Sequence, residues 1–167
     1  MKKIHLIILY TLVITVILYL VYKHFEKDKT VYVDNIELFS GFKMKLELEK
    51  KYKEVETVRK AILDSIYNEI KIKIELNNIS DKEQLTILKR EFLIKKEQFE
   101  KENAETMKQY NEQIWNQLNE YTKQYGDENN YDYIFGANGQ GVLMYAKPIK
   151  NVTKELLEYS NKKFNGQ

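Results

Sequence analysis

Apolar residues recur at alternating steps of three and four along two long stretches of the chain. In the first stretch the repeated positions are Leu48, Tyr52, Val55, Ile62, Ile66 and Ile70, with Arg59 at the one skipped position. In the second stretch they are Leu85, Leu88, Phe92, Phe99, Met107, Tyr110, Ile114, Leu118, Tyr121 and Tyr125, interrupted at Lys95 or Lys96 and at Asn103. This spacing keeps a stripe of apolar side chains on one face of a helix. The pattern therefore predicts two long amphipathic helices.

The segment between the two stripes, residues 77–81, is rich in turn-forming residues. Ser80 followed by Glu83 fits a capping box at the start of the second helix. A turn there makes the helices antiparallel neighbours, so residues 43–125 are expected to form a helical hairpin. Neither helix contains Gly or Pro, and helices of roughly 35 to 45 residues extend about 50 to 65 Å. A pair of that length is expected to project as a tentacle.

An unbroken apolar run from Ile4 to Tyr22 follows a charged start and ends at Lys23. Its length of about 19 residues is enough to span hydrocarbon as a helix. No Ala or Gly precedes Gly41, so an Ala-x-Ala cleavage site is absent. We favour an uncleaved signal anchor within residues 1–23 over a cleaved signal peptide, followed by a linker at residues 24–30. The flanking lysines favour a cytoplasmic body by a small margin, against the other indications below.

Strand-forming residues flank the hairpin on both sides. Residues 30–34 are β-branched and aromatic, and residues 131–135 and 142–146 surround Asn138-Gly139, a strong β-hairpin signal. A final helix is expected to begin near Thr153, its candidate N-cap. These segments predict a head built from residues 31–42 and 131–164.

Three short strands without a covered face are marginal in water, so the head is expected to complete itself by association between chains. The predicted fold class is α+β, mostly α: a long antiparallel coiled-coil hairpin projecting from a small β head that assembles between chains. The candidate residues of this oligomerisation head are Val31, Val33, Tyr133, Ile134, Phe135, Val142, Leu143, Met144 and Tyr145.

Composition excludes several classes of function. The chain has 167 residues, of which 31% are charged, yet its formal net charge is only +2, without the concentrated basic patch of a nucleic-acid-binding protein. It contains no Cys, and its two histidines, His5 and His24, lie at the apolar run. A Cys metal site is therefore excluded, as is a His-based catalytic site in the body. We expect no catalytic residues, no metal and no cofactor, and hence no enzyme.

The region around the turn carries apolar residues on more than one face of its helices. One interpretation is a wider seam at the tip. The other is an apolar surface available to a binding partner. The candidate binding residues are Ile72, Ile74, Ile79, Ile87 and Ile94. If charge governs binding instead, the candidates are Lys71, Lys73, Lys95 and Lys96.

The order of these segments resembles a known family. The strand at residues 31–34, the segment 39–42, the charged helical hairpin, and above all residues 131–146 and 152–159 are similar to the OmpH/Skp family of periplasmic chaperones, in its Bacteroidetes form. The resemblance covers residues 30–164. It implies a homotrimer whose three tentacles enclose a cavity that holds unfolded outer-membrane proteins without ATP. The chain differs from well-known members in its expected anchor and in its nearly neutral charge.

The leading hypothesis is thus an ATP-independent holdase chaperone for unfolded outer-membrane and envelope proteins. It is expected to be a homotrimer in the periplasm, anchored to the inner membrane through residues 4–22, or soluble if the segment is cleaved. The alternative is a membrane-anchored coiled-coil scaffold or tether in the cell envelope, which would bind a folded partner.

Overall fold

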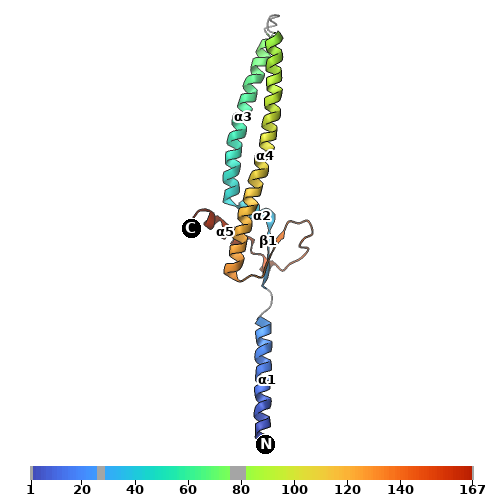
Figure 1. Cartoon of the computed structure of the whole chain (residues 1–167), viewed down its shortest axis with the longest axis vertical. Coiled ribbons are helices and arrows are strands. Elements are labelled where there is room, and N and C mark those ends of the chain that lie inside the picture. Colours follow the sequence, from blue (N-terminus) through green and yellow to red (C-terminus); the bar gives the residue numbers. More distant parts are fainter. Residues whose placement is uncertain (1, 26–28, 76–81, 167) are drawn as a thin grey trace.

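The protein is elongated, with a small head between two projecting helical parts (Figure 1). The computed structural model describes residues 2–25, 29–75 and 82–166. The first helix, α1 (Lys2–Phe25), extends from one side of the head, and the helices α3 (Lys43–Glu75) and α4 (Lys82–Asn129) extend from the other. The strands β1 (Thr30–Asp34) and β2 (Tyr133–Ala137), the helices α2 (Asn35–Gly41) and α5 (Thr153–Phe164), and the short 3₁₀ helix η2 (Pro148–Lys150) complete the head. The predicted mostly helical α+β class is confirmed.

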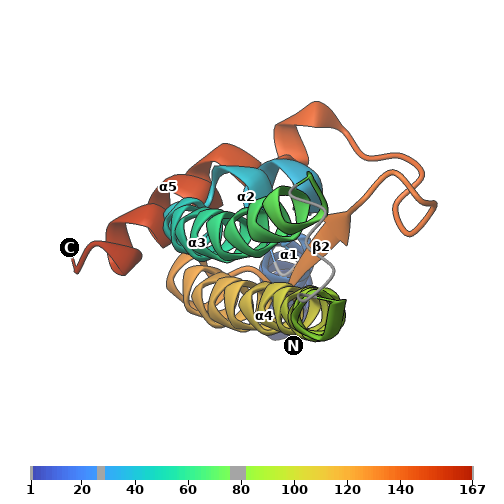
Figure 2. The ribbon, with the colours of Figure 1, turned by 90° about the horizontal axis from the view of Figure 1, so that it is seen from above.

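The long helices α3 and α4 lie side by side and antiparallel, as Figures 1 and 2 show together. Their 33 and 48 residues correspond to about 50 Å and 72 Å, so α4 reaches past the start of α3 into the head. The predicted helical hairpin is confirmed. The predicted turn at residues 77–81 and the capping residue Ser80 lie outside the described residues.

The sheet of the head joins strands from the two sides of the tentacle. β1 pairs with β2 in parallel, with Thr30 opposite Tyr133 and Asp34 opposite Ala137. Parallel strands need a long crossover connection, and here the whole tentacle supplies it. On the other edge of β1, Tyr32 forms an isolated parallel bridge with Asn151, and the Tyr32 carbonyl accepts a hydrogen bond from the Val152 N–H at 3.0 Å.

The predicted β-hairpin at residues 131–146 is wrong. Residues 142–146 have no regular structure, and the segment between β2 and η2 loops away from the helices (Figure 2). A two-residue type I′ turn needs positive φ at both Asn138 and Gly139. Gly139 has a φ of 72°, but Asn130 is the only non-glycine residue with positive φ in the described part of the chain. The Asn138 side chain instead accepts a hydrogen bond from the Gln140 N–H.

Both short helices of the head start at a defined polar contact. Asp34 caps α2, since its carboxylate accepts hydrogen bonds from the N–H groups of Ile36 and Glu37 at 2.8 and 3.0 Å. The expectation that Thr153 caps α5 is wrong, because Thr153 is already the first helical residue. The N-cap is Val152, whose side chain makes no capping hydrogen bond, and the Asn151 side-chain oxygen before it accepts from the Thr153 N–H at 2.9 Å.

The helix α4 runs four residues beyond the predicted end at Tyr125. Gly126 is buried inside it, and a Cβ there would lie 3.4 Å from Ile134. The helix ends at Asn129, and the next residue, Asn130, has a left-handed φ of 53°. The Asn130 N–H then bonds the Asp127 carbonyl, and the Tyr131 N–H bonds the Gly126 carbonyl. These two hydrogen bonds are those of a Schellman motif.

The hydrophobic core lies in the head, where β1, α2, α5 and the foot of α4 meet. Its buried apolar side chains are Val31, Val33, Leu38, Phe42, Ile114, Leu118, Tyr125, Val152 and Leu156. Val31 and Val33, predicted to contact another chain, are buried in this core within one chain. Their neighbour in the sheet, Ile134, packs against the same core. One chain therefore supplies more of its own core than its three short predicted strands suggested.

The prediction of a membrane anchor at residues 4–22 is not supported by the structure. Within the residues that it describes, no helix is long and apolar enough to cross a membrane. Apolar side chains from Ile8 to Tyr22 are exposed along α1.

Candidate functional site

The two apolar stripes face each other along the tentacle, and the seam between them is buried to different extents along its length. Near the head, Ile114 and Leu118 of α4 are buried, and near the far end Ile70 of α3 is buried. Between these points Tyr52, Leu63 and Ile66 of α3 are half-buried, whereas Val55 and Ile62 are 45% and 39% exposed. In the middle of the tentacle Leu63, and not the predicted Ile62, is therefore covered, and the seam is less fully buried there than at its ends.

The predicted binding isoleucines that the structure describes are not part of this seam. Ile72 and Ile74 of α3 and Ile87 and Ile94 of α4 are each more than half exposed. Ile79 lies outside the described residues. Because Ile87 and Ile94 are seven residues apart, they lie on the same face of α4. The exposure of the four described isoleucines argues against the wider-seam interpretation, because side chains that sealed a seam would be covered.

Two further exposed apolar residues in this part of the tentacle were missed by the sequence reasoning. Tyr67 of α3 and Leu93 of α4 are 57% and 63% exposed. The rings of Tyr67 and Phe92 lie beside each other, tilted by 48° with centroids 6.2 Å apart. Tyr67 lies seven residues before Ile74, so the sequence spacing alone could have placed both on one face.

The predicted binding lysines are arranged in local ion pairs. Lys71 pairs with Glu75, Lys95 with Glu91 and Lys96 with Glu100, each at 3.9 Å and each four residues apart on one helix. The fourth, Lys73, donates a hydrogen bond to Gln84 across the hairpin at 3.0 Å. Exposed pairs of this kind contribute little to stability, but they place a carboxylate beside each of the three paired lysines. The surface around the isoleucines is therefore mixed in charge.

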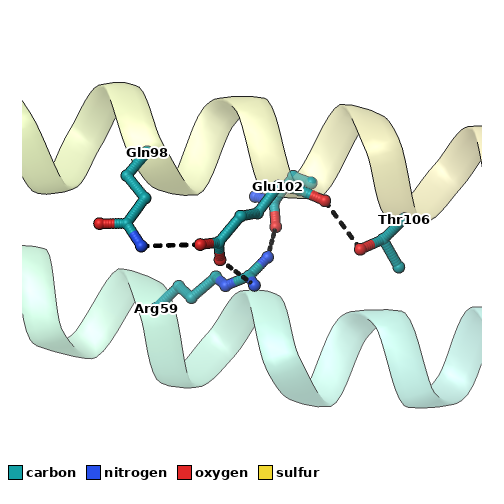
Figure 3. A network of polar contacts seen from close by, with 5 residues as sticks. Arg59, Gln98, Glu102 and Thr106 are labelled. Atoms are coloured by element: carbon teal, nitrogen blue, oxygen red, sulfur yellow. Dashed lines mark hydrogen bonds and ion pairs between the residues drawn. The ribbon is translucent and has the colours of Figure 1, made fainter.

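A polar cluster crosses the seam at its middle (Figure 3). The Arg59 guanidinium of α3 donates one hydrogen bond to the Asn103 side-chain oxygen and another to the Glu102 carboxylate, both on α4. Gln98 also donates to Glu102, at 2.7 Å. The Arg59 guanidinium lies 5.5 Å from the centre of the Phe99 ring, in cation–π range. Two of the polar interruptions of the apolar stripes, Arg59 and Asn103, thus meet each other.

The head carries a second exposed apolar surface on and after β2. Tyr133 and Phe135 project from the same face of β2, with stacked rings whose centroids are 6.0 Å apart. The other exposed members are Val142, Met144, Tyr145 and Ile149, while Leu143 is partly buried. Ile149, outside the predicted strands, was missed by the sequence reasoning. An open hollow of about 520 Å³ beside β2 is lined in part by Trp115, Ile134 and Val142.

Ionisable groups with shifted pKa values lie at the foot of the tentacle, away from the tip. Burial, followed by the neighbouring Tyr131 and Glu155, raises the pKa of Tyr125 to about 12. A hydrogen bond from Tyr159 and the nearby Lys163 lower the pKa of the Glu128 carboxyl. The Tyr159 hydroxyl donates to Glu128 at 2.7 Å and so joins α5 to α4. Among the described residues no group of three or more His, Cys, Asp or Glu side chains is placed to hold a metal ion.

The fold and these surfaces define a class of protein that projects a mixed-charge, two-helix tentacle from a small α+β head. Residues 29–159 match the family described as outer membrane protein (OmpH-like), and the chain belongs to this family. The resemblance found in the sequence is therefore confirmed. No curated relative matches the chain.

The fold is also similar to a crystal structure from Caulobacter crescentus, that of an OmpH-like protein described as an outer membrane chaperone. The TM-score is 0.58, and the match covers 81% of this chain and 85% of that one. At 14% sequence identity, this similarity supports the shared fold.

Proposed function

We propose that this protein is an ATP-independent holdase chaperone that binds unfolded outer-membrane and envelope proteins along its tentacle. The observation that carries the proposal is the exposure of Ile72, Ile74, Ile87 and Ile94 on an otherwise charged hairpin. Separated apolar side chains in a polar surface suit an extended client chain, which offers apolar groups at intervals and needs no single shaped pocket. Membership of the OmpH-like family and the chaperone description of the Caulobacter protein support this function.

We also propose that the working form is a homotrimer, with the tentacles around a shared cavity. The exposed apolar residues of the head support association between chains, because large contiguous apolar surfaces on soluble domains mark interaction sites. Tyr133, Phe135, Met144 and Tyr145 would lie in this interface. Residues 142–146 supply strand-forming residues that have no strand partner within the described part of the chain.

The proposed compartment is the periplasm, and the apolar run at residues 4–22 is proposed to direct export. The function needs no catalytic residue, so we propose a binding protein and not an enzyme. The mass of the mature protein would tell whether the N-terminal run is kept or removed.

The test compares two double variants with matched loss of exposed apolar surface. Ile72→Ser/Ile94→Ser removes two candidate binding residues, and Leu46→Ser/Val58→Ser removes two exposed apolar residues nearer the head. An unfolded outer-membrane β-barrel protein is diluted from urea into each protein, and its aggregation is followed by light scattering. We expect the first variant to lose most of its protection and the second to retain it.

Equal protection by both double variants would overturn the assignment of the tip isoleucines. In that case a Gln variant of Lys71, Lys73, Lys95 and Lys96, compared at low and high salt, tests whether charge carries the binding. A protein that keeps no unfolded client soluble, at any oligomeric state measured by light scattering, would contradict the chaperone function. The scaffold alternative would then lead, and it predicts a folded partner.

A further inference from the structure

The polar cluster in the middle of the tentacle places a charged side chain within a helical seam. The Arg59 side chain is 19% exposed and lies half-buried in the seam, as do Tyr52, Leu63 and Ile66 of α3. A charged side chain is therefore covered at the same level of the tentacle as its apolar neighbours in the seam. Its coverage comes from α4, through Phe99, Glu102 and Asn103.

The contacts of Arg59 are specific to the observed pairing of the helices. A guanidinium forms a planar fork that donates to two acceptors at once, and here the two acceptors are neighbours on α4. Moving α4 by one heptad would place Arg59 opposite Lys95 and Lys96, or opposite Gln109 and Tyr110. The first shift sets three cations together, and the second leaves a partly buried guanidinium without its carboxylate. Both shifts are costly.

Half-buried apolar residues flank the cluster, which adds side-chain hydrogen bonds between α3 and α4 to this part of the seam. The head core holds the foot of the tentacle through Phe42, Ile114 and Leu118. Beyond Arg59 the next buried member of the stripe on α3 is Ile70, about 16 Å further along the helix axis.

We propose that Arg59, Glu102 and Asn103 form a clasp that divides the tentacle into two parts. The foot is the end that the head core holds in place, and the distal part is the end whose two helices can separate from each other independently of the foot. The distal part consists of residues 62–75 of α3 and 82–99 of α4. While the clasp is closed, the distal helices stay paired although their seam is only partly sealed. When the clasp opens, the distal helices separate and the foot stays attached to the head core. The clasp is a property of the tentacle itself, and its test needs no client.

The test is hydrogen–deuterium exchange of the full chain, read by mass spectrometry on peptides from the distal part, the foot and the head. Arg59→Glu places two carboxylates together across the seam, and Glu102→Arg places two guanidinium groups together. We expect each single variant to exchange about tenfold faster in the distal part, because hydrogen bonds to charged groups are lost there. Peptides from residues 110–125 and from α5 should exchange at the wild-type rate.

The double variant Arg59→Glu/Glu102→Arg restores opposite charges across the seam and should return distal exchange close to the wild-type rate. Lys60→Glu is the matched control, because it makes the same charge change at the next, exposed position of α3. Lys60→Glu should leave hydrogen–deuterium exchange in the distal part unchanged.

Unchanged exchange in both single variants would contradict the proposed clasp. Faster exchange throughout the foot and head would overturn the division into two parts, and failure of the double variant to restore would overturn direct pairing.

Discussion

The hydroxyl of Thr153, at the start of α5, accepts a hydrogen bond from the main-chain N–H of Asp34, at the end of β1, at 2.8 Å. These residues are 119 positions apart in the chain. The same hydroxyl donates to the Asn151 side chain at 2.5 Å, and Thr153 is 1% exposed. One side chain thus joins the strand before the tentacle to the helix that closes the head after it.

Replacing Thr153 by Val should destabilise the head without changing its shape. The change keeps the volume but leaves the Asp34 N–H without its acceptor, which costs about 1–3 kcal/mol of unfolding free energy. Urea unfolding followed by circular dichroism measures the loss. Thr153→Ser should recover most of it, whereas Thr57→Val, on an exposed position of α3, should change stability by less than about 0.5 kcal/mol. A larger loss for Thr153→Ser than for Thr153→Val would show that the methyl group matters and the hydroxyl does not.

Phe42 should be among the most costly core positions to truncate. Its side chain is fully buried and packs edge to face against Tyr121 of α4 and Phe164 of α5. Phe42→Ala is expected to lower the unfolding free energy by about 3–5 kcal/mol, measured in urea. Leu93→Ala, on an exposed apolar residue of the tentacle, is the control and should have little effect. A small loss for Phe42→Ala would mean that the head core is not the stabilising centre of the chain.

Asn130 should tolerate glycine but not alanine. Its left-handed φ of 53° costs a residue with an ordinary side chain about 1–2 kcal/mol, whereas Gly adopts it freely. Asn130→Ala is therefore expected to lose about 1 kcal/mol, and Asn130→Gly to match or exceed wild type in urea unfolding. Asn116→Ala, in the exposed middle of α4, serves as the control. A Gly variant as unstable as the Ala variant would contradict the Schellman ending of α4.

Tyr125 should make the folded state sensitive to alkaline pH. Burial, Tyr131 and Glu155 raise its pKa from the ordinary tyrosine value of 10.0 to about 12. Between these values the unfolded chain releases the phenol proton and the folded chain retains it, so stability falls as the pH rises. The melting temperature of Tyr125→Phe should therefore decline less steeply than that of wild type between pH 10 and pH 12. Parallel declines would show that Tyr125 does not control this range.

The hairpin was predictable because its signal is local and repeated. A stripe with steps of three and four specifies a helix wherever it occurs, and the absence of Gly and Pro lets the helix continue. The polar interruptions Arg59 and Asn103 were also found in the sequence, but the sequence did not show that they meet. Their meeting depends on the register of two helices whose contacts join residues about 44 positions apart.

The head was less predictable because its elements depend on contacts between distant segments. Asn138-Gly139 had the composition of a tight turn, but the backbone at Asn138 takes another conformation and β2 pairs with β1 instead. The sequence suggests that Gly126 ends a helix, yet Gly126 is buried within α4. Because glycine has no side chain, the Ile134 side chain can pack close to the α4 backbone there. Thr153 was expected to cap α5, but its hydroxyl accepts a hydrogen bond from the main-chain N–H of Asp34 at the end of β1.

The sequence by itself determined the helical tentacle, the strand β1, the final helix, the family and the apolar character of the tip, because each rests on residues near one another in the chain. The tertiary structure decided which apolar residues are core and which are surface. It buried Val31 and Val33, exposed Ile72, Ile74, Ile87 and Ile94, and placed the Arg59 side chain within the seam of the tentacle. The physical reason is that burial and hydrogen-bond pairing depend on what packs against a residue from elsewhere in the chain, which a local pattern does not specify.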